Sequence, residues 1–275
     1  MIKEQGIRLM VIGAHPDDCE SKTGGIAVRI LRKGGSVLYV SATNGNAGHH
    51  VMKRDELKQR RFLETRKVAE EFGIQYHVMD NNDGDLQNTL ENRNRLIGLI
   101  RSFKPDIIVT HRTNDYHTDH RNTGLLVQDA SFLLRVPLTV PDVPALEYEP
   151  VILYMADGFK KPLPFKPDVV IDTEEYLDEK AKMLYCHESQ FFEWLPWLDG
   201  ELDQVPKDEK GRLQWCRQWL LNRSKNLMNP EIMKTYQKIY GDKAKEKLIS
   251  FEAFEVSEYG AYVTQEELCE IFELP

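Results

Sequence analysis

The stretch Ile7-Arg-Leu-Met-Val-Ile-Gly-Ala-His-Pro-Asp-Asp-Cys-Glu20 decides the fold that we expect for this chain. Its apolar run over residues 7–12 is too short for a typical helix and ends at a glycine, so it predicts a buried strand. Directly after this strand come one imidazole and two adjacent carboxylates, from His15, Asp17 and Asp18. In an open α/β sheet, ligands bind at the carboxyl ends of the strands. The loop is therefore a candidate binding site.

Apolar strands recur in the first half of the chain and are separated by amphipathic helices. Further strands are expected at 36–43, 76–79 and 107–110, and helices at 21–33, 55–72 and 88–103. This alternation predicts a parallel sheet with right-handed crossovers. In the strand order 3-2-1-4 that is common in doubly wound sheets, the first and fourth strands are neighbours. The loops that follow these two strands, residues 15–20 and 111–121, then meet at one edge.

The second half continues this pattern and then changes character. A helix is expected past residue 124 up to about 134, then a proline-rich loop, strands near 151–154 and 169–171, and a helix over 175–186. From about 191 to 247 the chain is charged and helix-prone and holds all four tryptophans. Because no linker or repeat interrupts the chain, we expect a single domain over 1–275 with a C-terminal helical insertion at about 191–247. The expected fold class is α/β and Rossmann-like, with a mainly parallel sheet flanked by helices.

The composition is that of an ordinary soluble globular protein, with 41% apolar and 29% charged residues among 275. The net charge of −8 argues against a nucleic-acid binder held by phosphate contacts. No apolar run has the length of a signal peptide or a transmembrane helix, and the four cysteines are scattered. We therefore expect a cytoplasmic protein that binds neither nucleic acid nor a membrane. The oligomeric state stays open, a homo-oligomer included.

Two polar loops carry the expected chemistry, because both offer histidine and aspartate side chains at strand ends. The candidate side chains are those of His15, Asp17, Asp18, His117, Asp119 and His120. Three protein ligands and an open water position define a catalytic zinc site, and His15, Asp18 and one of the later histidines would supply that set. Zinc lowers the pKa of its bound water towards neutral. Asp17, which is not needed as a ligand, would then accept the proton of that water.

The first loop has a simpler interpretation when it is taken alone. Asp17 and Asp18 would then cap the following helix, and His15 would hold a turn. The second group of histidine and aspartate residues, after another predicted strand, argues against this interpretation. Gly24-Gly25 lacks the glycine and lysine patterns of phosphate-binding loops, so it favours close packing of a helix on a strand.

The chain resembles the LmbE-like / PIG-L family of zinc-dependent N-acetylglucosaminyl deacetylases. The resemblance rests on several motifs that occur in the family's order from about residue 7 to residue 190. These motifs are Ala14-His-Pro-Asp-Asp-Cys-Glu20 with Gly24-Gly25, Thr43-Asn-Gly45, Arg61-Phe-Leu-Glu64, His117-Thr-Asp-His120 and His187-Glu-Ser-Gln190, with a weaker match near 251–254. The resemblance implies a Rossmann-like fold and an amide hydrolase that depends on zinc.

The resemblance also implies which residues hold the metal. His15, Asp18 and His120 match the family's zinc ligands, and Asp17 matches its general base. A set of two histidines and one aspartate also accommodates iron(II) or another divalent metal, so the residues alone do not identify the ion. His111 competes with His120 as a ligand, but its place at the strand end favours contact with backbone or substrate.

Further matching residues are implied to handle the substrate. His117 matches the histidine that polarises the amide carbonyl, stabilises the oxyanion or protonates the leaving amine, and Asp119 matches the carboxylate that orients it. Arg61 lies where the family often has a substrate-binding arginine, although the adjacent Arg60 leaves the register open. His49-His50 looks like a metal pair, but neighbouring side chains on an extended loop diverge, so we expect both rings to be exposed.

The resemblance, together with these residues, implies a zinc-dependent hydrolase that deacetylates an N-acetylglucosamine-type amino sugar or glycoconjugate, releasing acetate and a free amine. The expected partner is therefore a small amino-sugar substrate. One alternative is an amidase of a thiol conjugate or another N-acyl small molecule. Another is a non-catalytic sugar-binding protein on the same scaffold, and the intact set of six site residues argues against it. The substrate itself is not fixed, because many family members have Glu-Gly where this chain has Asn46-Ala-Gly-His-His50.

Overall fold

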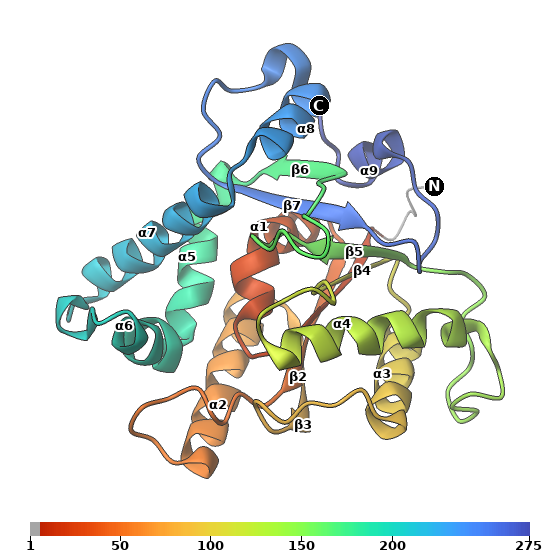
Figure 1. Cartoon of the computed structure of the whole chain (residues 1–275), viewed down its shortest axis with the longest axis horizontal. Helices are drawn as coiled ribbons and strands as arrows, with labels where there is room; N and C mark the ends of the chain where they lie inside the picture. Colours follow the sequence, from red (N-terminus) through yellow and green to blue (C-terminus); the bar gives the residue numbers. More distant parts are fainter. Residues whose placement is uncertain (1–5) are drawn as a thin grey trace.

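A seven-stranded sheet in the order β3-β2-β1-β4-β5-β7-β6 forms the centre of the computed structural model, which describes residues 6–275 (Figure 1). The strands are β1 (Arg8–Gly13), β2 (Ser36–Thr43), β3 (Gln75–Asn81), β4 (Ile107–Thr110), β5 (Val151–Met155), β6 (Val169–Asp172) and β7 (Phe251–Val256). Strand β1 pairs in parallel with both β2 and β4. The predicted strand order 3-2-1-4 and the mainly parallel sheet are thus confirmed.

Helices cover both faces of the sheet. They are α1 (Asp18–Arg32), α2 (Arg54–Phe72), α3 (Leu90–Phe103), α4 (Thr118–Ser131), α5 (Leu177–Cys186), α6 (Leu195–Leu198), α7 (Glu209–Leu227), α8 (Pro230–Tyr240) and α9 (Gln265–Ile271). Alternate residues of β1 belong to two different core clusters. Leu9 and Val11 pack with α1, α2, α5 and α9, whereas Met10 and Ile12 pack with α3 and α4. A strand buried on both faces is an unbroken apolar run, as residues 9–12 are.

Strand β7 was not predicted, and it pairs antiparallel with both β5 and β6 (Figure 1). Its sequence, Phe251-Glu-Ala-Phe-Glu-Val256, does not show the apolar pattern of a buried strand, because one of the buried positions is occupied by Glu252. Lys180 of α5 lies 2.7 Å from the Glu252 carboxylate. The backbone N–H groups of Gly25 and Ile26, in the middle of α1, each donate to it at 2.8 Å. These partners compensate the buried charge and connect the last strand to the first helix.

Helices α1 and α4 begin earlier than the apolar pattern predicts. Helix α1 begins at Asp18 and not at residue 21, and α4 begins at Thr118 with His117 as its N-cap. Their first turns are polar, which suits a helix N-terminus. These turns therefore lack the apolar periodicity from which the start of a helix is predicted. As a consequence, Asp18 and His120 lie on the first turns of two helices that leave the same edge of the sheet.

The tryptophan-rich stretch is helical, as predicted. A π-helical turn over Gln190–Trp194 leads into α6, and α7 and α8 follow. Helix α7 packs beside α5 (Figure 1), where Cys216 and Leu220 join a core cluster with Leu184 and Phe191. That residues 1–275 form one domain carrying this stretch as an insertion stays a prediction. In the described part of the chain, no helix combines the length and the apolar character needed to cross a membrane.

Candidate metal and catalytic site

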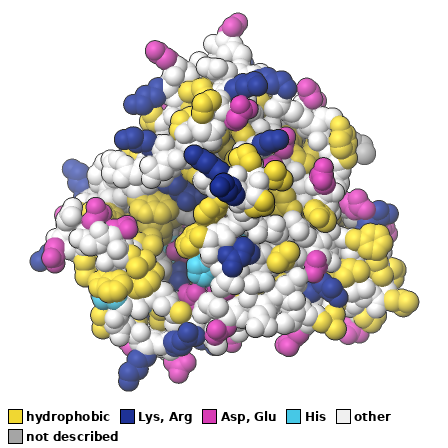
Figure 2. Space-filling view, viewed as in Figure 1, with side chains coloured by type: hydrophobic (Ala, Val, Ile, Leu, Met, Phe, Trp, Pro, Cys, Tyr) yellow, Lys and Arg dark blue, Asp and Glu magenta, His cyan; other side chains and the backbone are white. Residues whose placement is uncertain are grey.

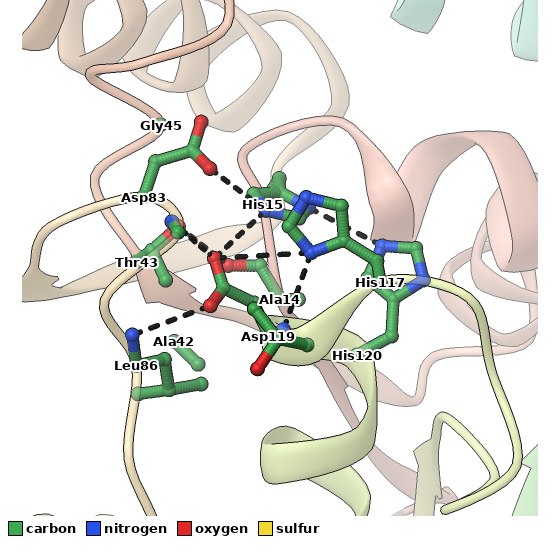
Figure 3. Close-up of polar contacts among 12 residues, drawn as sticks. Ala14, His15, Ala42, Thr43, Gly45, Asp83, Leu86, His117, Asp119 and His120 are labelled. Carbon is green, nitrogen blue, oxygen red and sulfur yellow. Dashed lines mark hydrogen bonds and ion pairs between the residues drawn. The ribbon is translucent and has the colours of Figure 1, made fainter.

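The two predicted loops meet at the carboxyl ends of β1 and β4. His15 leaves the end of β1, and His117 and His120 come from the end of the β4 loop and the start of α4. Figure 3 shows these three imidazoles turned toward one another, with Asp83 and Asp119 beside them. The arrangement follows from the adjacent parallel strands, which bring their carboxyl-terminal loops to one place.

Three side-chain atoms from these loops lie at nearly equal separations. Nδ1 of His15 lies 3.3 Å from Nε2 of His120 and 3.4 Å from Oδ2 of Asp18. The remaining pair, His120 Nε2 and Asp18 Oδ2, is 3.5 Å apart. In a tetrahedral zinc site with bonds of about 2.0–2.2 Å, two ligand atoms lie about 3.3–3.6 Å from each other. The three predicted ligands therefore fit a single small cation.

Carboxylates face the outer nitrogens of both ligand histidines. Nε2 of His15 lies 3.2 Å from Asp119 Oδ2 and 3.3 Å from Asp83 Oδ1. Nδ1 of His120 lies 3.0 Å from Asp115 Oδ2. A histidine that donates one ring N–H to a carboxylate presents the lone pair of its other nitrogen, which is the usual arrangement around protein-bound metals. This outer ring of carboxylates is the second observation that fits a metal.

No role was predicted for Asp83 or Asp115. Asp115 stands in the second polar loop, so its place could be anticipated, but Asp83 follows β3 without any motif. Burial raises the pKa of Asp83, yet its contact with His15 outweighs burial and holds that pKa below the ordinary range. For Asp115 too, the His120 imidazole outweighs burial and lowers the pKa. Both groups therefore stay ionised.

The charge of this group of side chains favours a cation. Burial lowers the pKa of His15, but the carboxylates of Asp119, Asp18 and Asp83 outweigh burial and raise that pKa well above its usual value. Burial raises the pKa of Asp18, but His120 and His111 lower it well below its usual value. The same carboxylates would stabilise a bound divalent ion.

Asp17 precedes α1 but makes no side-chain cap hydrogen bond. Its Oδ1 lies 3.1 Å from Nη2 of Arg61, and its side chain is 18% exposed. Burial raises the pKa of Asp17, with the Arg61 guanidinium opposing that shift. The capping interpretation therefore fails for this residue, and its carboxylate lines the cavity beside His15 and Asp18.

Arg61 is buried and holds the loops around Asp17. Its Nη2 donates to Pro16 O at 2.9 Å, and its Nη1 donates to Gly45 O at 3.3 Å. Gly45 has a φ of 67°, and a Cβ on it would lie 2.4 Å from Arg61 Nη1. This close approach gives the Thr43-Asn-Gly45 turn its physical reason. These contacts make Arg61 a positioning residue for Asp17, and its predicted contact with substrate stays a prediction.

His117 caps α4 through its ring. Its Nδ1 accepts a hydrogen bond from the backbone N–H of Asp119 at 3.2 Å, which leaves the ring proton on Nε2. Burial, followed by the nearby His15 and His120, lowers the pKa of His117, so the ring is neutral. The carboxylate of Asp119, expected to orient His117, instead lies 4.0 Å from its Nδ1 and closer to His15. Asp119 thus holds His117 through its backbone.

The Asp119 carboxylate joins three loops. Besides facing His15, it accepts hydrogen bonds from the backbone N–H of Gly84 at 2.7 Å and of Leu86 at 3.2 Å (Figure 3). The loop after β3 is therefore attached to the start of α4 beside the candidate metal ligands.

Of the other histidines, His111 lies against two of the candidate ligands, with its Nε2 3.3 Å from Asp18 Oδ2 and its ring stacked on that of His120. Nε2 of His111 accepts the N–H of Ala14 at 3.1 Å, and burial, first among its causes, lowers the pKa of His111 to about 3. This confirms the predicted backbone contact. His49 and His50 are not exposed as expected, because His50 stacks between His49 and Trp197, with ring centroids 4.9 and 5.0 Å away. The tryptophan-rich stretch covers them.

A cavity of about 710 Å³ opens above these residues. Figure 2 shows the hollow, in which basic, acidic and histidine side chains lie near apolar ones. One wall carries Tyr116 and Phe159, and the tryptophan-rich stretch contributes Trp194 and Trp219. A volume of this size accommodates a small-molecule ligand, and aromatic walls beside polar groups suit a sugar ring.

Two known sequences resemble this chain over more than half of its length. The chain is 29% identical to the diacetylchitobiose deacetylase of Thermococcus kodakarensis over 202 residues, which cover 70% of this chain and 74% of that protein. It is 25% identical to the mycothiol S-conjugate amidase of Streptomyces coelicolor over 189 residues, which cover 57% and 62% of the two chains.

Solved structures share the fold. The N,N'-diacetylchitobiose deacetylase from Pyrococcus horikoshii matches with a TM-score of 0.68 and 20% identity, covering 94% of this chain and 88% of that chain. GalB, the 4-carboxy-2-hydroxymuconate hydratase from Pseudomonas putida KT2440, matches with a TM-score of 0.69 and 17% identity, covering 94% and 98%. The PIG-L family, described as GlcNAc-PI de-N-acetylase, matches residues 10–131. The match thus covers the residues that carry both polar loops.

Proposed function

We propose that this protein is a metal-dependent amide hydrolase that deacetylates an N-acetylglucosamine-type amino sugar or glycoconjugate. The observation that carries the proposal is the separation of 3.3–3.5 Å among His15 Nδ1, Asp18 Oδ2 and His120 Nε2, with the Asp17 carboxylate beside them. The similarity to the diacetylchitobiose deacetylase supports the reaction and the class of substrate.

His15, Asp18 and His120 would hold the metal. Zinc suits two imidazoles and one carboxylate, and iron(II) or another divalent ion accommodates the same donors. When bound, the ion polarises the amide carbonyl and makes water a stronger acid.

Asp17 is the candidate general base. It is not needed as a ligand, lines the cavity beside the candidate ligands, and is held by Arg61 at 3.1 Å. Its raised pKa makes it a stronger base than an exposed aspartate, which favours proton abstraction from water near neutral pH. The proton that Asp17 takes is then available for the amine nitrogen, so that acetate and a free amine leave.

His117 is the candidate group that stabilises the carbonyl oxygen of the substrate amide. As a neutral imidazole with its proton on Nε2, it can donate a hydrogen bond to that oxygen as negative charge develops there. The hydrogen bond from the backbone of Asp119 fixes the ring before substrate arrives, so little reorganisation is needed during the reaction.

A second candidate function is an amidase that acts on a thiol conjugate or another N-acyl small molecule. The similarity to the mycothiol S-conjugate amidase favours it as the alternative. The fold by itself does not decide the reaction, because GalB, a hydratase, has a similar fold. The side chains at the sheet edge carry the argument for amide hydrolysis.

The proposed setting is the cytoplasm, with a small molecule as the partner. Support comes from the cysteines, all four of which are free, with Cys19, Cys186 and Cys216 buried. The oligomeric state is left open.

The test is the release of acetate and primary amine by the purified protein with added zinc. N-Acetylglucosamine, N,N'-diacetylchitobiose and larger N-acyl conjugates form the panel, and His120→Ala is the control. We expect equal amounts of acetate and amine from at least one N-acetyl amino sugar, and neither product from the control. Release from the larger conjugates alone would support the amidase. Stoichiometric zinc without hydrolysis of any amide would overturn the proposal.

A further inference from the structure

Most charged side chains that line the cavity have a partner of opposite charge. The pairs are Asp17 with Arg61, Asp18 with His15, Asp83 with His15, Asp115 with His120, and Asp157 with Arg112. Two cationic side chains, Lys22 and Arg223, line the same cavity. Within residues 6–275, neither forms an ion pair or a side-chain hydrogen bond, although Arg223 lies over the Trp219 ring at 5.9 Å. Lys22 and Arg223 are therefore the cations of the lining that have no carboxylate in direct contact.

The two cations come from different parts of the chain. Lys22 lies on α1 four residues after Asp18, so both side chains are on one face of the helix, about 6 Å apart along its axis. Arg223 lies on α7, four residues from both Trp219 and Leu227, and these three residues line the cavity along one face of that helix. The segment that matches the PIG-L family thus supplies one cation, and the tryptophan-rich stretch supplies the other.

Lys22 and Arg223 also lie near each other. Both line a second cavity of only about 20 Å³ that lies between α1 and α7. Burial, followed by Arg223, lowers the pKa of Lys22, and burial lowers the pKa of Arg223, while the carboxylates of Asp18, Asp115 and Asp157 oppose both shifts. Within the described residues neither cation touches a carboxylate, so the N–H groups of both side chains are available to a ligand of opposite charge.

We propose that Lys22 and Arg223 form an anion subsite, so that the preferred substrate carries a carboxylate or phosphate near its acetamido group. The acetamido part of this inference rests on the proposed function, whereas the anion subsite does not. A guanidinium fork and an ammonium group together suit the oxygens of either anion. A neutral disaccharide would leave both cations without a partner.

The first experiment compares charged and neutral substrates of similar size. The probes are N-acetylglucosamine, N-acetylglucosamine 6-phosphate and N-acetylmuramic acid, which carries a carboxylate. We expect kcat/KM for at least one charged probe to exceed that for the neutral sugar by roughly tenfold or more, because charge-assisted hydrogen bonds contribute on that scale. The better charged probe identifies which anion the subsite prefers.

Variants assign this preference to the two cations. Lys22→Met and Arg223→Gln should each lower the ratio of charged to neutral kcat/KM by about tenfold, mainly through KM. Lys22→Arg and Arg223→Lys keep the charge and should retain much of the ratio, which also shows that the positions tolerate substitution. Lys225→Met and Arg217→Gln are matched controls, because both side chains lie on α7 but do not line the cavity. These controls should keep the wild-type ratio.

A binding measurement separates this inference from the proposed function. Glucosamine 6-phosphate and glucosamine are titrated into the zinc-loaded protein by calorimetry, since neither contains an amide to hydrolyse. Tighter binding of the phosphate, weakened in Lys22→Met and Arg223→Gln, would support the subsite even if no amide is cleaved. Hydrolysis of neutral sugars, with no charged probe preferred in turnover or binding, would overturn the subsite and leave the proposed function standing. Unchanged charge preference in both variants would also overturn it.

Discussion

The carboxylate of Asp115 lies 3.0 Å from Nδ1 of His120, the ring nitrogen that does not face His15. Asp115 belongs to the loop after β4, and His120 to the first turn of α4. The pair therefore joins a loop to a helix, and Nε2 of His120 faces the other candidate ligands. A carboxylate in this position fixes the tautomer and orientation of a ligand histidine.

Asp115→Asn should weaken zinc binding without abolishing it. We expect the zinc affinity to fall about 10–100-fold, because the ligands stay in place while their support is lost. His120→Ala should lose stoichiometric zinc, and His117→Ala should keep it. Elemental analysis and competition with a chromogenic chelator measure these differences. Equal zinc retention by the two histidine variants would contradict the ligand assignment.

Asp17→Asn should keep its zinc and lose most of its turnover. We expect kcat to fall by about 10²–10⁴-fold, because the amide cannot accept the proton of water. Steady-state amine release and zinc content are measured on the same preparation. An active, fully metallated variant would show that another group is the base.

Arg61→Lys distinguishes positioning of Asp17 from contact with substrate. A lysine cannot reach Pro16 O, Gly45 O and Asp17 with the fork of a guanidinium, so we expect kcat to fall roughly tenfold with little change in KM. The neighbouring Arg60→Lys is the control, because Arg60 pairs with Glu193. A raised KM with normal kcat would instead support the substrate-binding role that the family resemblance implies.

His187→Gln should destabilise the protein more at low pH than at high pH. His187 is buried with its Nε2 2.7 Å from Glu20 Oε1. Burial lowers the pKa of His187, but Glu20, together with Asp17 and Glu64, outweighs burial and raises it. A raised folded-state pKa stabilises the protein fully below the unfolded value of about 6.5, and this stabilisation is lost as the pH rises through the folded-state pKa.

Urea unfolding at fixed zinc concentration tests this pH dependence. We expect the variant to lose about 3 kcal/mol of unfolding free energy at about pH 6, as for a broken buried ion pair, and less at about pH 9. The exposed His77→Gln is the control and should change little at either pH. A loss that is equal at both pH values would mean that the His187–Glu20 pair is not charged at low pH.

The parts of the fold that were predictable are those that depend on local pattern. An apolar run such as residues 9–12 indicates a strand buried on both faces, and the alternation with helices indicates parallel pairing. The meeting of the two polar loops at one edge of the sheet was predictable as well, because parallel neighbours bring their carboxyl ends together. His15, Asp18 and one of the later histidines could thus be grouped before any contact was known, and the family resemblance singled out His120.

What could not be predicted depends on partners that are distant in sequence. Strand β7 contains Glu252, whose burial makes sense only with Lys180 and the N–H groups of α1. Asp83 faces His15, but nothing in the loop after β3 indicates it. The covering of His50 depends on the position of Trp197. None of these contacts corresponds to a periodic pattern or a motif in the sequence.

The place of β7 between β5 and β6 sets an order on assembly during synthesis. A nascent chain that has emerged only as far as β6 holds both of its site loops, yet β6 has no neighbour in the sheet and the mid-helix N–H groups of Gly25 and Ile26 lack their carboxylate. The helix that begins at Asp18 is therefore completed by one of the last strands to be made. A premature stop before Phe251 would remove this support of α1 while leaving every candidate catalytic residue in the product.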